Sequence, residues 1–423
     1  MRRASSDSNR RTRRAVLATV AAGAVGSIAG CQGLDIDGNE DALERLEGEA
    51  ELDPTAAGPD GWPVEHGDLA NTRSAPADAV PEPPLSVTWT APFETHMGLP
   101  QPVVDGDVAV ASNWDDETFG VDVGSGDRRW TASMHGFEPR TTAAVADDAV
   151  LIGSRSEIRC VERGDGGRRW RAERYASGVN GGTPTVDGDL VLTATALGVA
   201  AFDLADGSRR WETRFGLAGT TTPAVVDGAV FVGGNDACLH VLDRETGDLE
   251  WRRNVDGGVD AGPAVVDETV YIGTDAGSVY AFDRDDGSER WHSSVAGSGI
   301  ESLAVGNGLV CAGANGDSLT ALDSETGTPI WRSGSYRSTY ANGPVVGDGL
   351  VFATVGLGAG FGSGISRHRD RTLGAFDAAN GEVVWRFDDA PIRFENGPAV
   401  ADGSVYATGT HTGDNERVLA CLR

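Results

Sequence analysis

The sequence has 423 residues, 59 of them glycine, and a formal net charge of −29 in which all 35 basic side chains are arginine. A single compact core stops growing at about 250–300 residues, so this length indicates several domains or a repeat architecture. So acidic a chain repels nucleic acid and anionic lipid headgroups, which excludes both as partners recognised by charge. The carboxylates are spread throughout, and we therefore predict a surface adapted to very high salt, with an acidic binding face as the alternative.

Residues 1–30 have the features of an export signal. Arg13 and Arg14 form a twin-arginine start, and the sixteen residues from Ala15 to Gly30 carry no charge. This run is too short to span a bilayer comfortably, so it predicts a signal segment rather than a transmembrane helix. It ends in Ile-Ala-Gly-Cys, which resembles a lipobox. We expect lipid on Cys31 and anchoring on the outer face of the cell membrane; an ordinary apolar N-terminus with an incidental cysteine is the alternative.

The stretch that follows Cys31 is acidic and rich in proline, glycine and alanine as far as about Pro84. Such a composition is typical of an extended flexible segment. We therefore expect a tether that holds the body off the membrane, assigned to residues 31–60, with the folded body at residues 61–423. Residues 1–30 carry six arginines and one aspartate, so their removal takes the net charge from −29 to −34.

Eight tryptophans recur at a nearly constant interval. A period of about 40 residues with four strand-like segments in each unit is typical of a β-propeller blade. In the clearest unit, four short strand-like runs between residues 263 and 295 are separated by turns that contain Asp and Gly. The spacings are 41, 40, 41, 40, 40, 40 and 54 residues between Trp89, Trp130, Trp170, Trp211, Trp251, Trp291, Trp331 and Trp385.

A turn of constant design precedes these tryptophans, and in the unit that ends at Trp291 it reads AFDRDDGSERW. Asp283 can accept backbone N–H groups across this turn, and Gly287 can adopt a positive φ. The tryptophan ring is large and flat and carries an N–H that needs a partner, so we expect structural docking between neighbouring blades.

These turns resemble the tryptophan-docking motifs of the pyrroloquinoline-quinone-like propeller family, and the segment from Trp62 to Asp68 with Asn71-Thr72 is similar to that family's opening signature. The resemblance covers residues 61–423 and implies an all-β fold: a single eight-bladed β-propeller with four-stranded antiparallel blades. Residues 85–89 would supply the outermost strand of the last blade. A WD-repeat propeller is the competing fold, but no Gly-His or Trp-Asp pair recurs at the repeat period.

The same family includes quinoprotein dehydrogenases, in which pyrroloquinoline quinone (PQQ) is held with Ca²⁺ in the central cavity, often below a disulfide between adjacent cysteines. This sequence has no adjacent cysteine pair, no haem-attachment motif and no readable set of calcium-binding carboxylates. We therefore expect no cofactor and a non-catalytic scaffold that binds an unknown protein partner or a polar small ligand. The alternative is a PQQ-dependent dehydrogenase with Ca²⁺. Packed thiols, without a metal, are expected at Cys160, Cys238, Cys311 and Cys421.

The family's outer-membrane assembly lipoprotein suggests a docking role, but that role requires an outer membrane. An acidic, lysine-free chain with a twin-arginine signal is more typical of halophilic archaea, so the specific role is not carried over.

The connections from each outer strand to the next inner strand must lie around the propeller axis on one face. The sequence varies there between otherwise similar repeats, which is where a binding specificity would be encoded. The predicted rim consists of Arg140, Asp260, Arg337, Tyr340, Arg393 and Glu395. We interpret its arginines as solvated rim charge, and a site for a polar or anionic ligand is the alternative.

Blade seven contains a glycine-rich insertion at residues 356–373, with a basic cluster formed by Arg367, His368, Arg369 and Arg371. We interpret it as a disordered insertion. A partner-docking loop, suggested by a basic cluster on so acidic a body, is the alternative.

Overall fold

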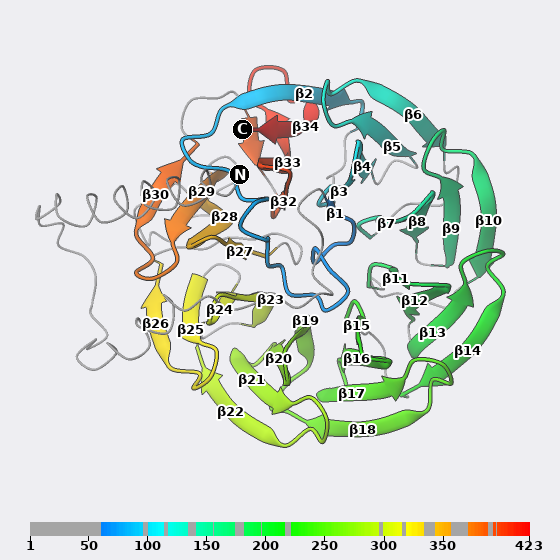
Figure 1. Cartoon of the computed structure of the whole chain (residues 1–423), viewed down its shortest axis with the longest axis vertical. Coiled ribbons are helices and arrows are strands. Elements are labelled where there is room, and N and C mark those ends of the chain that lie inside the picture. Colours follow the sequence, from blue (N-terminus) through cyan, green and yellow to red (C-terminus); the bar gives the residue numbers. More distant parts are fainter. Residues whose placement is uncertain are drawn as a thin grey trace, which may run out of the picture. The chain divides into compact units, whose positions relative to one another are not determined.

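The computed structural model describes residues 61–95, 100–113, 117–133, 141–154, 156–173, 182–195, 197–215, 221–295, 299–314, 319–333, 343–356, 371–387, 392–394 and 396–423. The regular elements in these ranges are all β-strands, and they form eight antiparallel sheets. Figure 1 shows the sheets as blades around a common centre. The predicted eight-bladed propeller is confirmed. No helix that could cross a bilayer is found in the described part of the chain.

Each of the first four blades runs from a short inner strand to a longer outer strand. Blade one consists of β3 (Val103–Asp105), β4 (Val108–Asn113), β5 (Glu117–Asp122) and β6 (Arg128–Ser133); blade two of β7 (Ala144–Ala146), β8 (Ala149–Gly153), β9 (Glu157–Glu162) and β10 (Arg168–Glu173); blade three of β11 (Thr185–Asp187), β12 (Leu190–Ala194), β13 (Gly198–Asp203) and β14 (Arg209–Arg214); and blade four of β15 (Ala224–Val226), β16 (Ala229–Gly234), β17 (Cys238–Asp243) and β18 (Leu249–Asn254).

Blades five to seven repeat this order, and blade eight is assembled from both ends of the described chain. Blade five consists of β19 (Val259–Val266), β20 (Thr269–Thr274), β21 (Ser278–Asp283) and β22 (Glu289–Ser294); blade six of β23 (Ile300–Gly306), β24 (Leu309–Ala314), β25 (Leu319–Asp323) and β26 (Pro329–Arg332); blade seven of β27 (Val345–Gly347), β28 (Leu350–Gly356), β29 (Arg371–Asp377) and β30 (Val383–Arg386); and blade eight of β31 (Ile392–Phe394), β32 (Ala399–Ala401), β33 (Ser404–His411), β34 (Arg417–Leu422) and β2 (Val87–Phe93).

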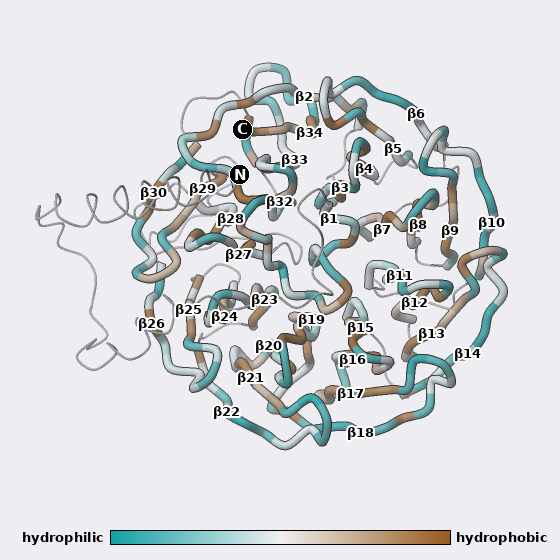
Figure 2. The backbone as a smooth tube through the Cα atoms, viewed as in Figure 1, coloured by the Kyte–Doolittle hydropathy of each residue, from teal (hydrophilic) through white to brown (hydrophobic). Residues whose placement is uncertain are grey.

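Burial follows the position of a strand in its blade. The middle strand β16, with sequence AVFVGG, is buried along almost its whole length, whereas the outer strand β18, LEWRRN, alternates between exposed and half-buried residues. Figure 2 shows the same trend, with hydrophilic residues along the outer strands. The core lies between blades: Leu151, Trp170 and Val191 of blades two and three belong to one cluster. Apolar burial between neighbours therefore stabilises the ring.

The recurrent tryptophans dock on the turn of the next blade. Trp211, for example, donates from Nε1 to the carbonyl of Arg244 at 2.9 Å, and its ring covers Gly247, whose φ is +73°. A Cβ at Gly247 would lie 2.5 Å from that ring, so only glycine fits. The same ring-on-glycine packing joins Trp89 to Gly126, Trp130 to Gly166, Trp170 to Gly207, Trp251 to Gly287, Trp291 to Gly327 and Trp331 to Gly381.

Blade eight differs at this turn. His411 stands where the other blades have an aspartate or, in blade two, Glu162, and Asn415, with φ +62°, stands where they have the positive-φ glycine. The backbone turn is kept, because the N–H of Asn415 still donates to the carbonyl of His411 at 3.0 Å. Trp385 of blade seven is half-buried and packs edge-on against Phe387, with ring centroids 6.0 Å apart.

The ring is closed by a strand from before blade one. β2 pairs with β34 from Val87, opposite Leu422, to Phe93, opposite Arg417. The predicted closing segment at residues 85–89 overlaps this strand, which begins two residues later and runs further.

Residues 61–84 do not form the tether that their composition suggests. Residues 61–80 lie inside the ring, where the short strand β1 (Gly61–Trp62) pairs with β3 of blade one and Trp62 is 1% exposed. The physical reason is that several apolar and polar side chains of this segment are buried by the inner strands. We call residues 61–80 the axial segment (Figure 1).

Candidate functional site

The axial segment contacts every blade of the propeller. Backbone carbonyls along it accept hydrogen bonds from the inner strands of blades two, four, five, six and seven, and blade eight is joined through the carbonyl of Ala79. The donors are the N–H groups of Val145, Val225, Val265, Val305, Val346 and Gly403, at 2.7 to 3.0 Å. Blade one is joined by β1 and blade three through Glu65. One short stretch of chain thus ties the eight blades together from inside.

Glu65 joins blades three and four at the centre of the ring. Its Oε2 accepts hydrogen bonds from Oγ1 of Thr183 at 2.6 Å and from Oγ1 of Thr222 at 3.1 Å. Thr222 also accepts the backbone N–H of Thr183 through its own Oγ1, at 3.1 Å. Both threonines are buried. A carboxylate with two hydroxyl donors is well satisfied, so this group fixes the segment.

Arg73 is the most deeply buried charge of the site, with 0% of the residue exposed. Its Nε donates to Nδ1 of His66 at 3.0 Å, and its Nη1 donates to Oε1 of Gln101 at 3.1 Å. Gln101 in turn donates to the carbonyl of Pro398 at 3.0 Å, which links blades one and eight. Burial, and then the Arg73 charge, lower the pKa of His66 well below its ordinary value, so this imidazole is neutral.

A compact turn holds these side chains in place. The N–H of Thr72 donates to Oδ1 of Asp68 at 2.9 Å, and two non-glycine residues, Asn71 and Arg73, have φ values of +59° and +51°. Asn71 donates from Nδ2 to the carbonyl of Thr222 at 3.1 Å. Its Oδ1 is buried and has no hydrogen-bond partner among the described residues. Positive φ at non-glycine positions is strained, and it occurs here where the polar side chains converge.

We call Glu65, His66, Asn71 and Arg73, with Gln101, Thr183 and Thr222, the axial cluster. Part of this stretch was predicted to be a family signature, but its side chains were not predicted to be site residues. A signal was present: an aromatic and six polar side chains lie within residues 62–73.

The predicted rim is only partly within the described residues. Asp260 is exposed on β19, and partial desolvation, with the Asp275 carboxylate nearby, raises its pKa. Arg393 lies half-buried on β31 of blade eight. The two belong to different blades, and no hydrogen bond or ion pair in the described structure joins them. Outside the described residues lie Arg140, Arg337, Tyr340 and Glu395 of the rim, together with Arg13, Arg14, Cys31, Arg367, His368 and Arg369. Arg371, the last member of the basic cluster, is the first residue of β29.

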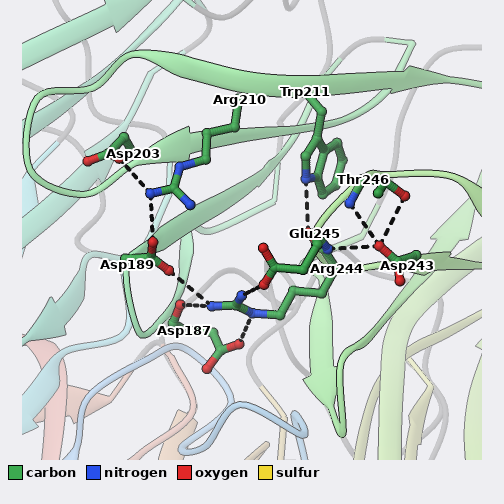
Figure 3. A network of polar contacts seen from close by, with 9 residues as sticks. All are labelled: Asp187, Asp189, Asp203, Arg210, Trp211, Asp243, Arg244, Glu245 and Thr246. Atoms are coloured by element: carbon green, nitrogen blue, oxygen red, sulfur yellow. Dashed lines mark hydrogen bonds and ion pairs between the residues drawn. The ribbon is translucent and has the colours of Figure 1, made fainter.

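Arginines also join the blades near their outer turns. In Figure 3, Arg244 of blade four contacts the Asp187 carboxylate of blade three, and it donates from Nη2 to the Asp187 carbonyl at 2.6 Å. Arg210 reaches Oδ2 of Asp189 at 2.6 Å, and Arg244 lies 3.5 Å from the other oxygen of Asp189. The indole N–H of Trp211 donates to the Arg244 carbonyl. Arg244 therefore takes part both in the ion pair between blades and in the docking of the tryptophan.

The same arrangement recurs at other junctions. Arg163 of blade two pairs with Asp105 of blade one at 3.2 Å, and Arg284 of blade five pairs with Asp227 of blade four at 2.9 Å. Planar guanidinium groups can contact several oxygens at once, which suits these sites better than an ammonium group. The arginines therefore have a structural use at blade junctions.

The axial cluster is chemically suited to holding structure and binding a polar group. The Glu65 carboxylate accepts hydrogen bonds from two hydroxyl groups, and the neutral imidazole of His66 accepts one from the guanidinium N–H of Arg73. The four described cysteines are free thiols, so the described chain contains no disulfide of adjacent cysteines.

A family model described as outer membrane protein assembly factor BamB matches residues 154–258 and 235–364. No curated protein sequence matches the chain. BamB from Moraxella catarrhalis is 19% identical, with a TM-score of 0.63 over 79% of this chain and 97% of that one. The computationally designed Ika8 protein is 16% identical, with a TM-score of 0.61 over 78% of this chain and 98% of that one.

A quinohemoprotein alcohol dehydrogenase from Comamonas testosteroni is 14% identical, with a TM-score of 0.68 over 90% of this chain and 83% of that one. Likeness at such identities establishes the shared fold and leaves the activity open. The matched repeats over residues 154–364 and this shared fold place the chain with the pyrroloquinoline-quinone-like β-propellers.

Proposed function

We propose that this protein is an exported, lipid-anchored scaffold that binds a protein partner or a polar small ligand and does not catalyse a reaction. The observation that carries the proposal is the axial segment, which joins the inner strands of the blades from within. A ring tied in this way holds the inner strands, to which the variable loops are attached, in fixed positions. Variable loops carried by a rigid frame are the usual construction of a binding surface.

The matching family model supports a docking role, because its description is that of an assembly factor. The polar groups of the axial cluster support the same conclusion. Glu65 and Arg73 form hydrogen bonds with Thr183 and Gln101 of the ring itself, so both charged groups have a structural role in holding the axial segment in place. Anchoring through Cys31 would keep the scaffold at the outer face of the cell membrane.

The test compares two charge-reversed variants of the same net charge. The double variant Asp260→Arg with Arg393→Glu alters inner-strand positions at the predicted rim. The matched control, Glu250→Arg with Arg386→Glu, alters exposed positions on the outer strands β18 and β30. Each protein is affinity-purified from detergent-solubilised membranes at high salt, and the co-purified proteins are quantified by mass spectrometry.

The proposal requires that a protein recovered with the wild type is lost by at least about tenfold in the rim variant, equivalent to about 1.4 kcal/mol of binding energy, and retained in the control. Equal recovery with both variants, or no specific protein with the wild type, would contradict protein docking at the rim.

A quinoprotein dehydrogenase is the second candidate, favoured by the structural likeness over 90% of the chain. Adding PQQ with Ca²⁺ and an alcohol or sugar separates the two candidates. We expect no reduction of an artificial electron acceptor and no rise in melting temperature, although ligand at 100 times its dissociation constant would add about 2.7 kcal/mol to stability. Turnover with a melting shift would establish the enzyme; a shift without turnover would indicate a cofactor-binding scaffold.

A further inference from the structure

Cys238 has different surroundings from the other described cysteines. Cys160 and Cys311 lie in apolar clusters, and burial raises the pKa of each thiol to about 12. Cys238 instead lies beside a carboxylate and an imidazole on blade four. We propose that Asp236, Cys238 and His240 bind a divalent transition-metal ion, for which Zn²⁺ is the best match.

The local sequence brings these side chains together. Asp236 lies in the turn between β16 and β17, and Cys238 and His240 are the first and third residues of β17. Alternate residues of a strand point to the same face, so the thiol and the imidazole share one face. On the neighbouring strand β18, Asn254 pairs with Cys238, which places an amide oxygen beside the thiol.

The donor atoms are already close to one another. One ligand atom from each of the three side chains lies within 4.8 Å of the other two. His240 Nε2 is 2.9 Å from Oδ2 of Asp236, and Cys238 Sγ is 3.1 Å from Oδ1 of Asn254. Ligand atoms around a tetrahedral zinc ion lie about 3–4 Å apart, given metal–ligand bonds of about 2.0–2.3 Å. Small side-chain rotations would therefore accommodate the ion, with Asn254 or water as the fourth ligand.

A buried atom of the cluster provides independent support. Oδ1 of Asp236 is buried and has no hydrogen-bond partner within the described structure, while Oδ2 of the same carboxylate faces Nε2 of His240. The His240 side chain is only 2% exposed. A buried polar atom without a partner costs about 1–3 kcal/mol, so native proteins rarely retain one. A metal ion bound by the Asp236 carboxylate would give this oxygen a partner and offset that cost.

The electrostatics of the cluster suit a cation. A neutral imidazole is a common metal ligand, and Nε2 of His240 already faces the Asp236 carboxylate. The ring of Phe215 stacks on the imidazole, with centroids 3.8 Å apart and planes at 14°, and fixes its orientation. Arg252, exposed on β18 opposite His240, is a positive charge near both Cys238 and His240, and it opposes metal binding. The carboxylate and a bound thiolate supply two negative charges against it.

The propeller repeat does not itself require these residues. In blade five, Ser278 and Tyr280 occupy the positions of Cys238 and His240; in blade two, these positions hold Glu157 and Arg159, which form an ion pair at 2.6 Å. Soft and borderline donors therefore meet in blade four, in the set that zinc prefers over calcium or magnesium.

The experiment is a Co²⁺ titration of the full-length protein after chelator treatment, in concentrated potassium sulfate, followed by absorbance. Bound thiolate gives a near-ultraviolet charge-transfer band, and Zn²⁺ should displace the ion and remove the band. We expect one Co²⁺ per chain. Cys238→Ser should abolish the band although Cys31 and the three other cysteines remain. His240→Gln should weaken binding by at least about 100-fold.

The matched control is His292→Gln, an exposed histidine on β22 of the next blade. It should leave both the band and the affinity unchanged. Melting curves without metal show whether each variant is folded, and a folded Cys238→Ser protein with an undiminished band would overturn the proposal. Absence of any band in the wild type, or equal weakening in His292→Gln, would overturn it as well.

Discussion

Arg73 donates a hydrogen bond from Nε to Nδ1 of His66 at 3.0 Å, and both side chains lie inside the ring of blades. The guanidinium is always charged, so this bond requires the imidazole to be an acceptor and therefore neutral. Protonation of His66 would remove the acceptor and place a second positive charge beside a fully buried one.

The first prediction is a loss of stability in acid. Burial and Arg73 lower the pKa of His66 in the folded protein, whereas the unfolded chain keeps a value near 6.5. Below about pH 6.5 the unfolded state binds a proton that the folded state does not, so the free energy of unfolding falls as pH decreases. His66→Gln should flatten this dependence between about pH 7.5 and 5, measured by chemical denaturation. His292→Gln should retain the wild-type slope, and an unchanged slope in His66→Gln would contradict the assignment.

The second prediction separates backbone strain from steric conflict at a docking turn. Gly247 and Gly228 have φ values of +73° and +82°, but a Cβ meets the Trp211 ring only at Gly247; at Gly228 nothing lies within 4 Å. Gly228→Ala should cost about 1–2 kcal/mol through strain alone. Gly247→Ala should cost about 1–3 kcal/mol more, because the ring must move. Equal losses in the two denaturation curves would show that the tryptophan is not held against the turn.

The third prediction concerns salt. The chain carries a net charge of −29, and its arginines at blade junctions pair with only part of the carboxylates. Screening weakens the remaining repulsion, so the unfolding midpoint should rise from about 0.1 M to several molar KCl. Sucrose at matched water activity is the control, because it favours compact states without screening charge. A flat or falling midpoint in KCl would argue against adaptation to high salt.

The fourth prediction concerns the anchor. Cys31→Ala should move the protein from the membrane fraction to the medium, because the remaining apolar stretch of residues 15–30 leaves with the signal. Fractionation with immunodetection measures this, and Cys238→Ser serves as a control for general effects of thiol loss. Retention of the Cys31→Ala protein on washed membranes would contradict lipid anchoring.

The blades could be predicted from the sequence because most of them dock on the next blade through the same tryptophan-on-glycine contact. A tryptophan such as Trp211 and a positive-φ glycine such as Gly247 must recur wherever one blade docks on the next, so the period is visible. Blade eight lacks this mark, since His411 and Asn415 replace the aspartate and the glycine. It was predicted from residues 85–89, which carry Trp89 and supply its outermost strand.

The axial cluster could not be predicted in the same way. Glu65 contacts Thr183 and Arg73 contacts Gln101, and both partners are far away in the sequence. Contacts of this kind do not recur with the period of the blades. The proposed metal ligands Asp236, Cys238 and His240 lie only two positions apart in the sequence. Such a pattern is not distinctive until β18 brings Asn254 beside Cys238. Local patterns therefore predicted the frame, whereas the sites depend on which strands the fold places together.

The pairing of β2 with β34 sets the order in which the molecule can form. Val87 is held by Leu422, and the carbonyl of Ala79 is held by Gly403, so the segment before blade one depends on residues of the last blade. Contacts so distant in sequence form slowly, and the ring cannot close before blade eight has been synthesised. Loss of residues 417–423 alone would remove β34 and release β2. The two segments act as a clasp that fastens only after all eight blades are present.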